Sequence, residues 1–225
     1  MRSSSYPTIA FRYLDPLEVP ALAALEAAAW PVSLQAGEDV IRRRLKLGHL
    51  MLVAAVPDRL AAALCCIPTS ELPFDDTRFP RDFGAFSSLP ASNPVRSVYV
   101  YSLCVHPEYR GENIVRNLIY DGIARASAFG AEWAVGDGRC PSYAGAEDDG
   151  PDKVRADPIF KAAIDSWSAT GRKPPLDSLI RDPTLRFYHR VVGCDFLRVC
   201  PNFLPQDTSS GGHRVIFIKN IPSAA

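Results

Sequence analysis

One stretch of the chain, residues 98–130, combines the signals of a strand, a tight turn and a long helix. Val98–Val105 is rich in β-branched and aromatic residues, which favour a strand, and His106-Pro107 ends it. Apolar residues then recur with a period close to 3.6 as far as Phe129, and Gly130 stands where a helix C-terminus favours glycine. The stretch therefore predicts a strand followed almost at once by a helix.

The connecting turn, residues 108–113, reads EYRGEN, and Asn113 is a favoured helix N-cap. Such a turn directs unpaired backbone N–H groups and the positive end of the helix dipole into one small space. We therefore predict an anion site suited to phosphates.

The V-x-P-x-Y-R-G-x-x-I pattern at this turn resembles the acyl-CoA pyrophosphate loop of the GCN5-related N-acetyltransferase (GNAT) superfamily, Arg/Gln-x-x-Gly-x-Gly/Ala. Arg110 and the additional Gly111 fit the pattern, whereas Asn113 and Val115 replace the small residues of the motif. The branched Val115 predicts displaced or weakly bound CoA. The residues that the resemblance assigns to CoA are Leu103, Cys104, Val105, Arg110, Gly111, Glu112, Asn113, Ile114, Val115 and Arg116. The first three would pair with the pantetheine arm as an added strand.

The order of elements along the chain also resembles this superfamily. Residues 8–14 predict a strand, 21–30 and 37–47 two helices, and 49–67 a hairpin, all before the central stretch. The resemblance implies an α/β (α+β) fold whose mixed, mostly antiparallel sheet has splayed parallel central strands and flanking helices. We expect a single domain over residues 1–225, with insertions at about 68–97 and 140–181.

Composition limits the classes of function. The formal net charge is zero, so the chain has no general basic surface for nucleic acid, although an aminoacyl-tRNA donor stays open. The basic run at residues 41–46 is interpreted as the solvated face of an amphipathic helix. The sequence lacks both an apolar leader and a membrane-length apolar run, which predicts a soluble, cytoplasmic protein.

Six cysteines show no C-x-x-C pair and no regular spacing. Several lie in strand-like apolar runs, so buried reduced thiols are expected and no metal site is predicted.

Acetyl transfer to an amine requires a base, a stabilised carbonyl oxyanion and an acid for the departing thiolate. The resemblance implies that a backbone N–H at a strand bulge near Cys104 binds the oxyanion. Strand alternation predicts Tyr99 and Tyr101 on one face, with Ser102 and Cys104 opposite. Tyr101 is a candidate proton carrier, but both tyrosines could instead pack or shape the substrate site, and a water chain ending at Glu71, Asp75 or Asp137 is an alternative base.

The acid is expected in a Phe-Tyr-x-x-x-Gly-like segment that ends at Gly193. Counting back without a gap places His189 in the tyrosine position of the resembling family, and one extra residue in the turn places Tyr188 there. Either side chain could donate a proton. His189 could also be a half-buried helix residue with a satisfied ring.

The resemblance implies that residues just past the next predicted strand, 131–136, face the acceptor, because the central strands of the family splay apart there. The candidates for the acceptor pocket are Asp137, Arg139 and Tyr143, together with Tyr99. In the alternative interpretation Asp137-Gly138 is an ordinary turn and Arg139 pairs with Glu147 or Asp148. The long connection at 68–97 either walls the acceptor pocket or is a surface loop.

These observations lead to an acyl-CoA-dependent N-acyltransferase, most simply an N-acetyltransferase, with acetyl-CoA or another acyl-CoA as co-substrate and a small-molecule amine as acceptor. One alternative keeps the fold but uses a carrier-protein or aminoacyl-tRNA donor. Another is a non-catalytic acyl-CoA-binding domain. We expect a monomer or a homodimer with no membrane partner.

Overall fold

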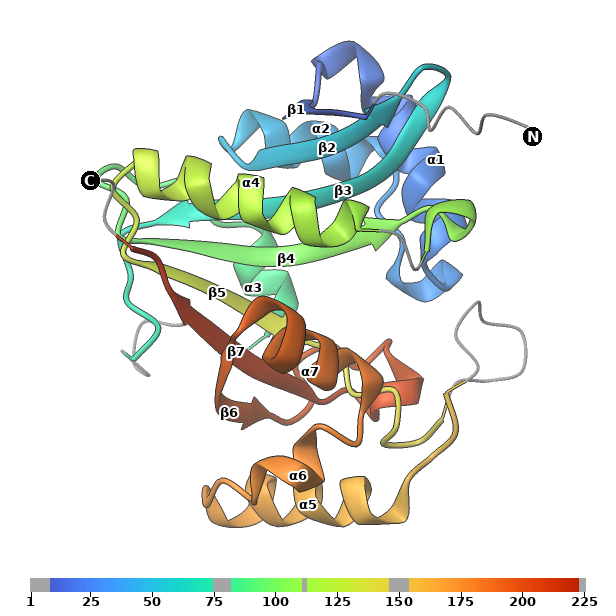
Figure 1. Ribbon diagram of the computed structural model, residues 1–225, viewed down its shortest axis with the longest axis vertical. Coiled ribbons are helices and arrows are strands. Elements are labelled where there is room, and N and C mark those ends of the chain that lie inside the picture. Colours follow the sequence, from blue (N-terminus) through green and yellow to red (C-terminus); the bar gives the residue numbers. More distant parts are fainter. Residues whose placement is uncertain (1–8, 75–81, 111–112, 146–153, 223–225) are drawn as a thin grey trace, which may run out of the picture.

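The computed structural model describes residues 9–74, 82–110, 113–145 and 154–222. One seven-stranded sheet, in the order β1-β2-β3-β4-β5-β7-β6, forms its centre (Figure 1). The strands are β1 (Ala10–Tyr13), β2 (Leu50–Val56), β3 (Arg59–Thr69), β4 (Ser97–Val105), β5 (Trp133–Gly138), β6 (Asp195–Cys200) and β7 (Arg214–Asn220). Only β4 and β5 pair in parallel among these strands. The predicted mixed, mostly antiparallel sheet is confirmed, while Thr8, at the start of the predicted first strand, lies outside the described residues.

Helices cover both faces of this sheet (Figure 1). They are α1 (Val19–Ala29), α2 (Glu38–Lys46), α3 (Phe83–Ser87), α4 (Ile114–Ala128), α5 (Pro158–Thr170), α6 (Leu176–Leu179) and α7 (Pro183–Phe187), with short turns η1 (Pro16–Glu18), η2 (Val32–Leu34), η3 (Pro107–Tyr109), η4 (Tyr188–Val192) and η5 (Thr208–Ser210). One apolar core lies under α1 and α2 and includes Leu22 and Ile41. The other lies under α4, α5 and α7 and includes Leu118 and Phe160.

Helix α5 forms for the local reasons that its sequence indicates. The Asp157 carboxylate accepts hydrogen bonds from the backbone N–H groups of Ile159 and Phe160, and Pro158 takes the first helical position. Gly171 ends the helix in the left-handed conformation at φ 69°. Helix α5 then lies along β6 at the edge of the sheet (Figure 1).

The parallel strands separate halfway along β4. They pair from Ser97 opposite Trp133 to Val100 opposite Gly136, and β5 continues only with β7 on its other side. Gly136 allows the close approach of β7 at this point, because a Cβ there would lie 2.7 Å from Cε2 of Phe217. The edge of β4 beyond Val100 therefore faces an opening without a strand partner among the described residues.

A bulge in β4 changes which side chains share a face. Cys65 of β3 lies opposite Ser102, and Cys66 lies opposite Val100, so Tyr101 is an extra residue. Tyr101 and Ser102 consequently both point toward α1 and α2, and Cys104 also lies in that core. The predicted alternation, with Ser102 and Cys104 opposite the two tyrosines, is wrong because the bulge shifts the strand by one residue. The bulge itself lies at Tyr101 and not near Cys104.

The segment that ends at Gly193, which contains Tyr188 and His189, changes its winding at Tyr188. Helix α7 begins after Asp182, whose buried carboxylate accepts from the N–H groups of Thr184 and Leu185. From Tyr188 the chain forms the wider π-helical turn η4, which Gly193 ends at φ 75°. A π turn adds one residue to a helical turn and is often associated with a functional position.

Candidate active site

A cleft with a volume of about 1140 Å³ is lined by residues from both faces of the sheet. Val115 of α4 and Tyr188 line it on one face, and Glu26 of α1 and Arg44 of α2 line it on the other. Residues 100–105 of β4 form the wall between them. The cleft therefore passes through the opening where β4 leaves β5.

The turn before α4 forms the outer end of the cleft. Arg110 and Val115 line the cleft, and an Nη2 group of Arg110 donates to the carbonyl of Ala29 at 3.4 Å. Ile114 is buried in the core, whereas Arg116 is exposed. Asn113 holds the N-cap position, but its side chain makes no capping hydrogen bond.

Two of the residues predicted to bind CoA, Gly111 and Glu112, lie outside the described part of the chain. Leu103, Cys104 and Val105 all line the cleft along the open edge of β4. Backbone N–H and C=O groups along an open edge are suited to pairing with an amide-containing chain. The pantetheine arm of CoA, which the sequence predicts along these residues, is such a chain.

Tyr188 and His189 are neighbours with different surroundings. The Tyr188 ring stacks on Phe217 with 4.1 Å between ring centroids, and the side chain lines the cleft. Burial raises the pKa of the Tyr188 phenol above its ordinary value. His189 does not line the cleft, and its Nδ1 lies 3.0 Å from the carbonyl oxygen of Cys194. The π turn supplies the extra residue that brings Tyr188, rather than His189, to the cleft.

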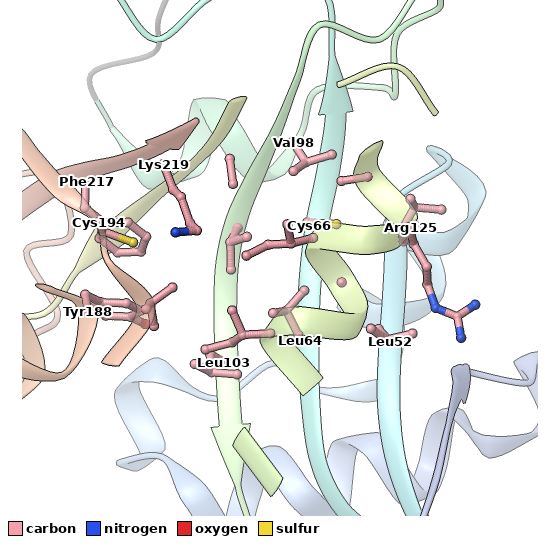
Figure 2. Close-up of a pocket in the computed structure, with 18 of the residues that line it drawn as sticks. Leu52, Leu64, Cys66, Val98, Leu103, Arg125, Tyr188, Cys194, Phe217 and Lys219 are labelled. Carbon is pink, nitrogen blue, oxygen red and sulfur yellow. The ribbon is translucent and has the colours of Figure 1, made fainter. Parts of the chain in front are cut away.

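Tyr188 also borders a second, apolar pocket of about 60 Å³ beneath α4 (Figure 2). Figure 2 shows Tyr188, Phe217 and Lys219 on one side of this pocket, with Leu64 and Arg125 toward the other. Both pockets share Leu103 and Val100 in their linings. The small pocket is therefore an apolar extension next to the opening in the sheet.

A buried ionic network lies beside the cleft at the ends of β5 and β7. Asp207 accepts hydrogen bonds from Nε of Arg139 at 2.9 Å and from Nη1 of Arg214 at 2.6 Å. Arg214 also donates from Nε to Asp137 at 3.1 Å, and the Tyr99 hydroxyl donates to the same carboxylate. The network joins three of the predicted pocket residues, but only Asp137 and Arg139 of those line the cleft.

The pKa values of the two carboxylates of this network are shifted in opposite directions from the ordinary value. Burial raises the pKa of Asp137 to about 6, against the opposing charge of Arg214. Burial alone would also raise the pKa of Asp207, but hydrogen bonds from Arg139 and the charge of Arg214 hold it well below its ordinary value. Sequence reasoning missed Asp207 and Arg214. Arg139 pairs with Asp207, and its alternative partners Glu147 and Asp148 lie outside the described residues.

Tyr143, the remaining predicted pocket residue, does not line the cleft. Its hydroxyl donates to Oδ1 of Asp165 at 2.7 Å and accepts from Lys161 at 3.2 Å. Both partners are on α5. Tyr143 therefore anchors α5 in this structure.

Glu26 is a buried carboxylate that sequence reasoning also missed. The Ser102 hydroxyl donates to its Oε1 at 2.8 Å, and the residue lines the cleft. Burial raises the pKa of Glu26. A signal was present in the sequence, because Glu26 lies on the same helical face as Leu22, Leu25 and Ala29, where a carboxylate is unusual.

The Tyr101 side chain is engaged with a histidine. Its hydroxyl lies 3.2 Å from Nδ1 of His49, and Nε2 of His49 lies 2.8 Å from the carbonyl oxygen of Leu89. Nε2 must donate to that carbonyl, so Nδ1 accepts from Tyr101. Burial raises the pKa of Tyr101 well above its ordinary value, which makes its hydroxyl a poor base. Of the other predicted bases, Glu71 does not line the cleft and Asp75 lies outside the described residues.

The long connection after β3 contributes to the wall of the cleft. Asp82, Phe83 and Gly84 of this connection line the cleft, as the wall interpretation predicts.

All six cysteines are buried and free, as expected. Within the described ranges, no group of His, Cys, Asp and Glu could hold a metal ion, and no helix could span a membrane.

No family model matches the sequence, and no curated protein matches it. Solved structures do. The loading GNATL domain of CurA from Lyngbya majuscula is similar at a TM-score of 0.73 and 17% identity, over 95% of this chain and 98% of that one. The GphF GNAT-like decarboxylase in complex with isobutyryl-CoA has a TM-score of 0.71 at 21% identity, over 95% and 100%.

Aminoglycoside 6′-acetyltransferase type Ii is similar at a TM-score of 0.56 and 13% identity, over 96% and 99% of the two chains. At these identities the likeness concerns the fold. It agrees with the strand order, the splayed β4–β5 pair and the helix that follows the predicted pyrophosphate turn. The chain therefore has the fold of the GCN5-related N-acetyltransferase superfamily.

Proposed function

We propose that the chain is an acyl-CoA-dependent N-acyltransferase that moves an acyl group, most simply acetyl, from the CoA thioester to the amine of a small molecule. The observation that carries this proposal is the cleft through the β4–β5 opening. It connects the turn before α4, which suits a pyrophosphate, with an inner chamber that contains the buried Glu26 carboxylate. The likeness to an isobutyryl-CoA complex and to an aminoglycoside acetyltransferase supports both halves of the proposal.

The donor would enter along the open edge of β4. Arg110 and the N–H groups at the start of α4 would bind the pyrophosphate, and the backbone of residues 103–105 would pair with the pantetheine amides. The backbone N–H groups at the Tyr101 bulge would then lie near the thioester, where a donor stabilises the carbonyl oxygen as it gains charge.

The proposed transfer is a direct attack. The amine nitrogen forms a bond to the thioester carbonyl carbon while Glu26 accepts its proton, which the raised pKa of Glu26 favours near neutral pH. The carbon–sulfur bond breaks and its electron pair goes to sulfur. Tyr188 donates a proton to this sulfur. Within the described structure its hydroxyl has no hydrogen-bond partner, and its raised pKa keeps it protonated beforehand.

The test combines binding with turnover. Calorimetric titration with acetyl-CoA is expected to give a micromolar Kd, on the order of −8 kcal/mol. A panel of small amines with acetyl-CoA is then expected to release CoA thiol and to yield acetylated amine by mass spectrometry. If the protein neither binds acetyl-CoA nor releases thiol, and Val115→Gly does not restore binding, the proposed function is wrong.

A second candidate function keeps the fold and changes the donor or the reaction. Asn113 and Val115 depart from the small residues that the CoA motif requires, and a carrier-bound donor would relax that requirement. Two of the similar structures are a loading domain and a GNAT-like decarboxylase. This candidate predicts transfer from an acyl group on a carrier protein, or loss of CO₂ from an acyl-CoA that bears a carboxylate. Product formation from acyl-carrier protein or malonyl-CoA, with no acetylation of any amine, would select it.

A further inference from the structure

Arg44 is a buried cation whose charge has no direct partner among the described residues. The residue is 7% exposed, although its neighbours Arg42 and Arg43 on α2 are exposed as the sequence predicts. Its Nε is buried without a hydrogen-bond partner, and its guanidinium forms no ion pair with any described residue. The interpretation of residues 41–46 as a solvated face therefore fails at this one position.

Aromatic rings hold the Arg44 guanidinium against the cleft. Its Cζ lies 4.7 Å from the Tyr101 ring centroid and 5.7 Å from that of Phe83. All three residues line the acceptor side of the cleft. Stacking on ring faces leaves the N–H edges of a guanidinium available for a planar anion.

The burial of this charge is unfavourable unless a ligand supplies the opposite charge. Arginine stays protonated in proteins, so Arg44 cannot lose its charge as a buried lysine can. A buried charge without a partner is strongly unfavourable, and an apolar side chain of similar length would fill the same space without that cost. The burial of the Arg44 charge is explained if the cleft binds an anion.

Glu26 presents the opposite charge to the same part of the cleft that Arg44 lines. It lines the cleft beside Ser102, and the positive charge of Arg44 acts on its carboxylate. No direct ion pair forms between the two. A cleft wall with separate acidic and basic groups matches a ligand that carries both an amine and an anionic group.

We propose that the acceptor is an amino carboxylate, such as an amino acid, whose carboxylate binds Arg44 while its amine faces Glu26. This inference rests on the proposed function and names its substrate class. In the transfer, the acceptor nitrogen gains the acyl group and loses a proton to Glu26, and CoA leaves as the thiol after its sulfur takes a proton. The carboxylate of the acceptor is unchanged.

The experiment compares α-amino acids with their own carboxamides as acceptors of the acetyl group from acetyl-CoA. We expect the wild type to prefer the acid over the amide by roughly 10- to 100-fold in kcat/KM, the range of one charge-assisted pair. Arg44→Met should abolish this preference and leave the affinity for acetyl-CoA unchanged. Arg44→Lys should retain part of it, and exposed Arg43→Met should retain all of it. Melting temperatures verify that each variant is folded.

Several results would overturn the inference. A wild type that acetylates amides as well as acids would do so, and so would an Arg44→Met variant that keeps the preference for acids. Titrations with malonyl-CoA and acetyl-CoA give another test: if Arg44→Met weakens only malonyl-CoA binding, the anion at Arg44 belongs to the donor. O-phosphoethanolamine against ethanolamine tests whether a phosphate replaces the carboxylate, and acetylation of the phosphate compound alone would contradict the proposal.

Failure of the proposed function gives a different result. Calorimetric titration of the protein with the amino acids and their amides needs no turnover. Selective binding of the acids by the wild type, lost in Arg44→Met, would support the anion site even if no acetyl transfer occurs. Absence of that binding together with absence of acid-selective transfer would overturn the inference.

Discussion

Substitution of Asp207 by asparagine tests the buried network most directly. The Asp207 carboxylate accepts from Arg139 at 2.9 and 3.0 Å, from Arg214 at 2.6 Å, and from Ser209 and Ser210 at 2.8 Å each. Asparagine keeps the shape but removes the negative charge. Arg214 would retain Asp137, whereas Arg139 would lose its only carboxylate partner among the described residues.

The expected loss of stability follows from this geometry. Removing one partner of a buried ion pair costs about 3–5 kcal/mol, because the remaining charge stays buried. For a chain of this size, that corresponds to a fall of roughly 6–20 °C in melting temperature. Denaturant unfolding followed by circular dichroism measures the difference. Exposed Asp58→Asn, the same chemical change beside Arg59, should cost less than about 1 kcal/mol.

The pH dependence supplies a second test of the same residue. Because the folded-state pKa of Asp207 is lowered, its contribution is complete above the ordinary pKa near 4 and is lost as the pH falls toward the folded value. The difference between wild type and Asp207→Asn should therefore be constant from about pH 7 to 5 and shrink by about 1.4 kcal/mol per unit below about pH 4. A loss below 1 kcal/mol at neutral pH, or a loss that grows in acid, would refute the reasoning.

Three further variants separate catalysis from packing. Tyr188→Phe should lower kcat by about 10²- to 10⁴-fold with little change in melting temperature. His189→Ala should instead lower stability by about 1 kcal/mol and keep the rate. The reverse pattern of rates in stopped-flow thiol release would exclude Tyr188 as the acid. Glu26→Gln should lower the rate to a similar extent and remove the acid limb of the pH–rate profile, which in the wild type should lie above the ordinary glutamate pKa; an acid limb that persists would reject Glu26 as the base. Gly136→Ala should cost about 1–3 kcal/mol, because the new Cβ collides with the Phe217 ring, and an unchanged unfolding midpoint would show that β7 gives way freely.

The central stretch illustrates what local sequence patterns can predict. The strand and the long helix within residues 98–130 lie where their propensities place them, and Gly130 follows the end of the helix at φ 84°. Such signals depend on residues close together in the chain. The order of the elements was therefore accessible from the sequence, and with it the type of sheet.

The surroundings of the cleft depend instead on contacts between distant residues. Asp137, Asp207 and Arg214 meet only because β5 and β7 pair, and no local pattern identifies such a set. The face on which Ser102 lies depends on a single extra residue in β4 that strand alternation does not reveal. Arg44 is hidden in a basic run, where composition indicates solvent for every member.

The bulge at Tyr101 also determines which face of the sheet each later side chain of β4 occupies. Upstream of it, the tyrosines alternate with valines, and downstream this alternation is shifted, so that Leu103 and Val105 keep to the α4 side. If Tyr101 were instead paired regularly, with no bulge, each side chain from 102 to 105 would lie on the opposite face although the composition of the strand would be unchanged. Glu26 would then lose the hydroxyl of Ser102, and the wall offered to a donor thioester would exchange its apolar face for its polar one. The spacing of this strand is thus as much a part of the site as any side chain on it.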